Sequence, residues 1–110
     1  MLQIQIGTQT PAATDDPLCR AVLGWAPGMS EDQVWAVARG VWKLNPDRAR
    51  DEAEAQIVNT AGTVLAVARI LAVAPVGDRY VLDGELLRGD PRVGALTPHP
   101  HPSRNPVAYV

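Results

Sequence analysis

The sequence predicts an α+β fold, a small mixed β-sheet domain with two or three short helices. Three observations support this prediction: ten Pro and nine Gly among 110 residues, several runs with strand-like patterning, and a clear helix start at Ser30. Frequent turn residues separate short elements, which is typical of β-rich domains. With 46% hydrophobic residues the chain can bury a core. Its length suits a single domain over residues 1–110.

Residues 1–29 are expected to add a strand and a short helix to a core formed by residues 30–110. Apolar residues alternate with glutamines over residues 1–7, which predicts a strand with one face toward solvent. The sequence Asp15-Asp16-Pro17 combines an acidic cap with a first-turn proline. A short helix from there to Gly24 is therefore predicted.

The clearest helix start is Ser30-Glu31-Asp32-Gln33, which has the pattern of a capping box. Apolar residues follow at helical spacing, and Gly40 is a poor helix residue, so this helix is expected to end near Arg39. Residues 41–44 are predicted to be extended. Asn45-Pro46-Asp47 repeats the signal of a cap followed by proline, which predicts a short solvated helix reaching toward Glu54.

A hairpin is predicted from residue 56 to residue 73. Its turn is Asn59-Thr60-Ala61-Gly62, and its second arm, residues 63–73, is apolar almost throughout. Such an arm is either a central strand buried on both faces or a strand bent around a barrel corner.

The last third of the chain is predicted to contain two short strands separated by a loop. Residues 79–83 have strand character, and Gly84 is expected to end that strand. Residues 89–106 contain many prolines and have the pattern of a loop. Residues 107–110 are short and apolar, as expected for a closing strand.

The formal net charge of −2 excludes a global basic field that would draw the protein onto nucleic acid or a membrane. Any such binding must therefore come from a local site. Nine of the ten basic residues are Arg, a bias that proteome composition alone can produce.

The single Cys19 cannot form an intramolecular disulfide, and no membrane span or leader is recognisable, so a cytoplasmic protein without membrane contact is expected.

The sequence offers little for metal, cofactor or nucleophilic chemistry. His99 and His101 are two ligands at most, and we interpret them as exposed loop residues rather than a metal site. Cys19 is expected to be a buried structural thiol in the first helix. No serine lies in a strand-turn-helix elbow and no glycine-rich phosphate loop is present, so neither a catalytic residue nor a cofactor is predicted.

Aromatic and basic residues between positions 35 and 43 form the candidate binding motif. Trp35 and Arg39 are four residues apart and can share one helix face, Gly40 permits a close approach of the backbone, and Trp42-Lys43 follows. A tryptophan beside an arginine suits a flat base, because the ring stacks and the guanidinium binds base edges or phosphate. The alternative is that both tryptophans simply fill a core that lacks Phe.

The ordered motifs Trp35–Leu44, Arg69-Ile70, Arg79–Gly84 and Arg104–Val110 resemble a PUA-like domain of the ASCH, EVE and SRA-like group. Domains of this kind are β-barrels, which implies about five to six strands here. Some are fused to HNH or GIY-YIG nucleases, so a separately encoded nuclease is a candidate partner.

The resemblance implies a non-catalytic module that binds nucleic acid, DNA first of all, and reads a modified base in an aromatic pocket. Together with the basic residues nearby it indicates nine binding residues: Trp35, Arg39, Trp42, Lys43, Arg48, Asp83, Arg104, Asn105 and Tyr109. Two alternatives remain open. One is a regulatory module of the same fold that binds a protein or small molecule. The other is an ASCH-like amide hydrolase using Lys43 with Glu54 or Glu85.

Overall fold

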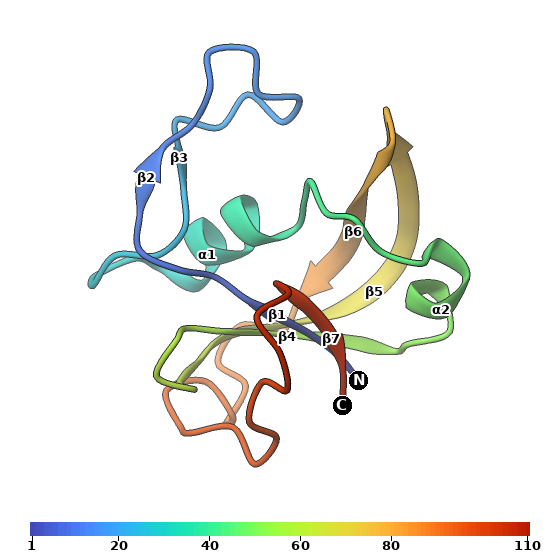
Figure 1. Cartoon of the computed structure of the whole chain (residues 1–110). Helices are drawn as coiled ribbons and strands as arrows, with labels where there is room; N and C mark the ends of the chain where they lie inside the picture. The colour runs from blue at the N-terminus through green and yellow to red at the C-terminus, as the bar shows by residue number, and fades with distance from the viewer.

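A computed structural model describes residues 1–110 as a five-stranded mixed sheet, a two-stranded ribbon and two helices (Figure 1). The strand order of the main sheet is β6-β5-β4-β1-β7. Strand β1 (Leu2–Gln5) pairs in parallel with β4 (Glu54–Val58), and the other pairs are antiparallel. The α+β class is thus confirmed. The sheet is open, with β6 and β7 at its edges, so the closed barrel that the resemblance implies is not confirmed.

Residues 10–23 form a projecting arm rather than the predicted helix (Figure 1). The arm contains the ribbon of β2 (Thr10–Pro11) and β3 (Val22–Leu23). The Asp16 carboxylate accepts hydrogen bonds from the backbone N–H groups of Leu18 and Arg20, and Cys19 has a φ of 54°. An Asp that binds backbone groups two and four residues ahead stabilises a turn, and left-handed backbone ends a helix. The helix prediction was therefore wrong.

Helix α1 (Glu31–Ala38) confirms the capping box, because the Ser30 side chain accepts from the backbone of Gln33 and the Gln33 side chain accepts from the backbone of Ser30. Its C-cap is Arg39, as expected. Helix α2 (Pro46–Arg50) confirms the second start signal, with Asn45 as the N-cap. It is shorter than predicted.

Strands β4 and β5 (Val64–Val76) confirm the predicted hairpin. The first five residues of β5 are mostly buried, but the strand becomes exposed from Arg69 and its register shifts between Ile70 and Ala72. Strand β5 is therefore bent and leaves the core beyond Arg69, rather than being buried on both faces along its whole length.

Strand β6 (Arg79–Leu86) runs through Gly84, which was predicted to break it. A Cβ at Gly84 would lie 2.5 Å from the Arg69 carbonyl oxygen and 3.1 Å from Cζ2 of Trp35. This glycine allows strand and helix to approach closely instead of ending the strand.

The two faces of the sheet are covered differently. Helix α1 packs on one face, where the main core cluster includes Leu2, Ile57 and Leu82. The other face is covered by the segment that follows β6, with Leu87 and Val93 packed against a small valine cluster. Gln3 is fully buried, so the face of β1 predicted to meet solvent is covered.

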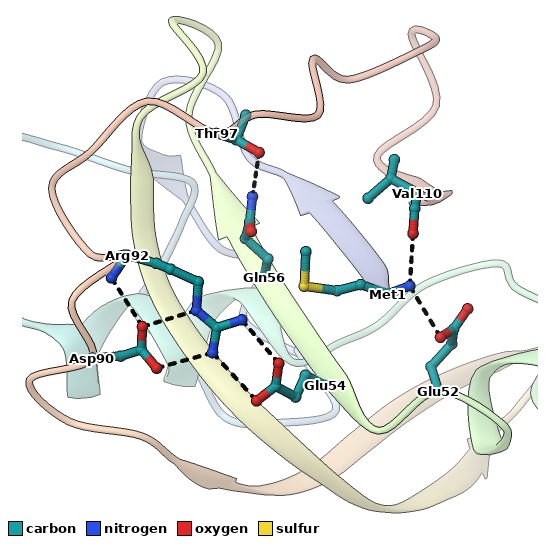
Figure 2. Close-up of polar contacts among 8 residues, drawn as sticks. All are labelled: Met1, Glu52, Glu54, Gln56, Asp90, Arg92, Thr97 and Val110. Atoms are coloured by element: carbon teal, nitrogen blue, oxygen red, sulfur yellow. Dashed lines mark hydrogen bonds and ion pairs between the residues drawn. The ribbon is translucent and has the colours of Figure 1, made fainter.

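Residues 87–106 are largely loop, as expected, but several polar contacts anchor them to the sheet (Figure 2). Gln56 Nε2 donates to Thr97 Oγ1 at 2.7 Å. The Arg92 guanidinium binds Asp90 and Glu54, with its closest contacts to both at 2.9 Å. These bonds hold the pKa of Asp90 at about 2 and lower that of Glu54.

Strand β7 (Val107–Tyr109) confirms the predicted last strand and pairs with β1. The backbones of Met1 and Val110 are joined by hydrogen bonds, and the Met1 amino group also contacts Glu52 at 3.1 Å (Figure 2). Neither helix has the length and apolar character needed to cross a membrane.

Candidate functional site

Trp42 is held at the outer edge of β6 by its backbone and its indole. Its N–H donates to the Tyr80 carbonyl at 3.0 Å, and the Tyr80 N–H donates back at 2.9 Å. The indole Nε1 donates to the Ala38 carbonyl at 2.6 Å, which fixes the orientation of the ring. The side chain is only partly buried. Trp42 therefore presents an oriented aromatic surface.

Gly40 makes this arrangement possible. It is buried against β6, and a Cβ there would lie 2.7 Å from Cγ1 of Val81. The Leu82 N–H donates to the Arg39 carbonyl at 2.7 Å, so the chain runs beside β6 from Arg39 to Trp42. The close approach predicted at this glycine is present.

A pocket of about 460 Å³ opens beside Trp42, and we call it the Trp42 pocket. It is lined by Trp42, Lys43, Leu44, Arg79, Asn105, Pro106, Val107 and Tyr109. The structure thus brings together four of the nine predicted binding residues from two distant segments of the chain. The volume lies within the range of small-molecule sites and is large enough for a single aromatic ring system.

One wall of this pocket is Tyr109, on β7. The Arg48 guanidinium carbon lies 3.9 Å from the centroid of the Tyr109 ring, a cation–π contact that joins α2 to β7. Arg48 does not line the pocket itself, so its contact with the site runs through Tyr109. Burial raises the pKa of Tyr109 above its usual value, and the positive charge of Arg48 opposes that rise.

The basic side chains without an acidic partner gather around this region. Six arginines form ion pairs with carboxylates: Arg20, Arg39, Arg50, Arg69, Arg88 and Arg92. The four basic residues left without one are Lys43, Arg48, Arg79 and Arg104. No Asp or Glu lines the Trp42 pocket. A concave site lined by charge of one sign attracts ions of the opposite sign even on a protein of opposite net charge.

Trp35, Arg39 and Asp83 belong to a different place, a cleft of about 500 Å³ between α1, β6 and the arm. Trp35 is 9% exposed and belongs to the main core. Arg39 donates from Nε to the Leu82 carbonyl at 3.0 Å and pairs with Asp83 at 2.7 Å. The structure does not bring these three residues to the Trp42 pocket, and Trp35 fills the core.

Arg104 lines a third hollow, of about 400 Å³, which we call the Arg104 hollow. Its lining contains no hydrophobic residue and consists of Gln5, Gly7, Thr60, Ser103, Arg104 and Pro106. Pro106 also lines the Trp42 pocket, so the two hollows meet at this residue.

The expectations for Cys19 and His101 are corrected. Cys19 is exposed, because the helix expected to bury it does not form. His101 is partly buried, with Nδ1 2.8 Å from Gln3 Oε1 and Nε2 2.5 Å from the Asn105 carbonyl oxygen. Nowhere do three or more His, Cys, Asp or Glu side chains gather in a group able to hold a metal ion.

The structure does not assemble the pair expected of an amide hydrolase. Glu54 is bound to Arg92, and Glu85 lies 3.6 Å from Arg69. Neither carboxylate lines the pocket that contains Lys43.

Sequence reasoning missed Arg79, Pro106 and Arg20. Arg79 reaches the pocket because Trp42 pairs with Tyr80, a register between distant segments that no local pattern reveals. Arg20 is nearly buried, binds Asp16 at 2.8 Å, and donates to the Val37 and Gly40 carbonyls at the end of α1. The spacing of Asp16 and Arg20 was the available signal for this pair.

Comparison with protein-family models, curated proteins and solved structures finds no match to this chain.

Proposed function

We propose that this protein is a non-catalytic nucleic-acid-binding domain whose Trp42 pocket accepts a DNA base, including a modified one. The observation that carries the proposal is the pairing pattern of the charges. Lys43 and Arg79 line the pocket, and Arg48 contacts its Tyr109 wall. None of the three has a carboxylate partner, and no carboxylate lines the pocket.

The aromatic residues supply the second part of the argument. Trp42 is partly exposed and its indole N–H is already bonded, so the surface it offers a ligand is mainly aromatic. Stacking of a base on an aromatic side chain is worth about 1–3 kcal/mol. Asn105 adds an amide side chain at the rim, which can donate to and accept from a base edge.

The position of the cations also agrees with the mild acidity of the whole chain. Six arginines are neutralised by nearby carboxylates, and the others lie at or beside the two hollows that meet at Pro106. A local site of this kind binds phosphate without a basic overall charge. We also propose the PUA-like relationship, which the order of motifs supports.

The test is a titration at low salt with short DNA strands that carry methylated, hydroxymethylated or unmodified bases. Tryptophan fluorescence and calorimetry measure the affinity for each strand. We expect Trp42→Ala to weaken binding about tenfold or more, which corresponds to the loss of one stacked base. The matched control is Trp25→Ala, because Trp25 is also partly buried but does not line the pocket.

Lys43→Gln and Arg79→Gln test the same site through side chains that are exposed and unpaired. Both variants are expected to fold normally and to bind DNA more weakly. They therefore test the proposed site even if Trp42→Ala is unstable. Equal and negligible binding of every DNA by the wild-type protein would overturn the proposal. Binding of an acidic peptide but no DNA would support a regulatory module instead.

A further inference from the structure

The Trp42 pocket does not stand alone, because three hollows meet at Pro106. Between the Trp42 pocket and the Arg104 hollow lies a third hollow of about 260 Å³, which we call the Gly40 hollow. It shares Trp42 and Pro106 with the first, and Gln5, Gly7 and Pro106 with the second. The three hollows therefore adjoin one another, and we name this row of hollows the Pro106 groove.

The charges along the Pro106 groove are of one sign. None of the twelve Asp and Glu residues lines any of its three hollows. Lys43 and Arg79 stand at one end and Arg104 at the other, all without ion-pair partners. Arg20, which borders the middle, is neutralised by Asp16. Positive charge at both ends and a neutral middle suit a ligand with more than one phosphate.

Arg104 is carried by an anchored segment. Ser103 Oγ accepts from the Asn105 N–H at 3.2 Å, and the Asn105 carbonyl contacts His101. The Gln5 N–H donates to the Pro106 carbonyl at 2.8 Å. The backbone on the C-terminal side of Arg104 is thus held against β1, so the exposed Arg104 side chain extends from an anchored stretch of backbone.

No element on this face is shaped to read a duplex. Duplex bases are read by a helix or ribbon inserted into a groove. Helix α1 packs on the sheet, and the β2–β3 arm, which projects from the sheet (Figure 1), carries Asp15 and Asp16 in the segment that joins its two strands. Concave pockets accept unstacked bases, and single strands offer these without the cost of unpairing.

We infer that the ligand is a single strand of nucleic acid that spans the Pro106 groove, with a base in the Trp42 pocket and its backbone reaching Arg104. This inference rests on the proposed function and specifies its ligand. It predicts that affinity depends on strand length, because a longer strand offers further phosphates to the cations at the two ends of the groove.

The experiment compares thymidine 5′-monophosphate with oligothymidylates of about four and about eight nucleotides, and with a hairpin duplex, by calorimetry. Affinity is expected to rise about tenfold or more from the mononucleotide to the four-nucleotide strand. Arg104→Ala should remove most of this gain, so that the four-nucleotide strand binds little more tightly than the mononucleotide. It should also reduce the dependence of log affinity on log salt by about 0.7, the contribution of one phosphate contact.

Arg104→Glu should weaken binding of the strands further. Arg88→Ala, which removes an exposed arginine on another part of the surface, is the control and should change neither length dependence nor salt dependence. The groove would be refuted as the binding site of a strand if the mononucleotide bound as tightly as the strands and Arg104→Ala changed neither affinity. That outcome would still be compatible with a base bound in the Trp42 pocket. Tighter binding of the duplex would also refute the groove. Failure of every nucleic acid to bind would refute the proposed function itself.

Discussion

Arg48 lies over the ring of Tyr109, with its guanidinium carbon 3.9 Å from the ring centroid. The two residues come from α2 and β7, elements at opposite ends of the core sequence. Their contact supports one wall of the Trp42 pocket. The cation in this contact, Arg48, forms no ion pair with a carboxylate. The short helix α2 therefore contributes to the site without lining it.

Removing the Arg48 cation should change both the stability of the Tyr109 wall and the pKa of Tyr109. Because the Arg48 charge lowers the pKa of Tyr109 against the raising effect of burial, Arg48→Ala should raise that pKa further. The lost cation–π contact should cost about 1 kcal/mol of stability and weaken DNA binding. An ultraviolet titration of the two tyrosines measures the shift. Arg50→Ala, on the same helix, is the control, and an unchanged Tyr109 titration in Arg48→Ala would contradict the assignment.

Gly40→Ala should displace the segment that carries Trp42. The added Cβ would meet Cγ1 of Val81 at 2.7 Å, and overpacking of this kind costs about 1–3 kcal/mol. Urea unfolding measures the loss of stability. Nothing lies within 4 Å of a Cβ at Gly7, so Gly7→Ala is the control. The double variant with Val81→Ala should recover part of the stability lost at Gly40, and strict additivity would argue against the contact.

Stability should fall in acid through the Asp16–Arg20 pair. Hydrogen bonds from Arg20 lower the pKa of Asp16 from 3.8 to about 2, and both side chains are less than 10% exposed. The folded protein therefore holds fewer protons than the unfolded chain between these values. The stability from this pair is present above pH 3.8 and is lost as the pH falls toward 2, about 2 kcal/mol in total.

Asp16→Asn isolates that contribution. At neutral pH it should destabilise the fold by about 3 kcal/mol, because it leaves a nearly buried arginine without its charged partner. The difference from wild type should shrink below about pH 4, as measured by chemical denaturation across pH. Some acid sensitivity should remain, because Asp90 also has a pKa near 2. Parallel stability curves for the two proteins would refute the assignment.

Thr97→Val should loosen the segment that carries Arg104. The Thr97 hydroxyl accepts from Gln56 Nε2 at 2.7 Å and from the His99 N–H at 3.1 Å. Leaving these donors unsatisfied should cost about 2 kcal/mol and increase hydrogen exchange over residues 97–106. Thr8→Val, at an exposed position, is the control. Unchanged exchange over this segment would show that Thr97 does not anchor it.

Local sequence signals predicted most of the elements in the core. The capping box at Ser30 and the proline after Asn45 each specify a helix start through contacts within a few residues, and both are present. The hairpin around Asn59 is also local. The failed helix after Asp16 shows the limit of such signals, because the same carboxylate that can cap a helix here binds Arg20 and a turn.

The candidate site was predictable only in part. Trp42, Lys43, Asn105 and Tyr109 line one pocket, whereas Trp35 and Arg39 lie in another cleft. A helix directs side chains four residues apart to one face, but the neighbours of that face depend on packing. Here the face of Trp35 meets Gly84 and the core.

The sequence by itself determined the α+β class, the main helix and hairpin, and the requirement that any anion site be local. Only the tertiary structure decided which cations remain unpaired and which aromatic residues border a pocket. The physical reason is the sequence separation of the contacts that each feature requires. Caps and turns depend on contacts within a few residues, whereas the pairing of β7 with β1 and of Trp42 with Tyr80 joins distant segments through the packing of the whole chain.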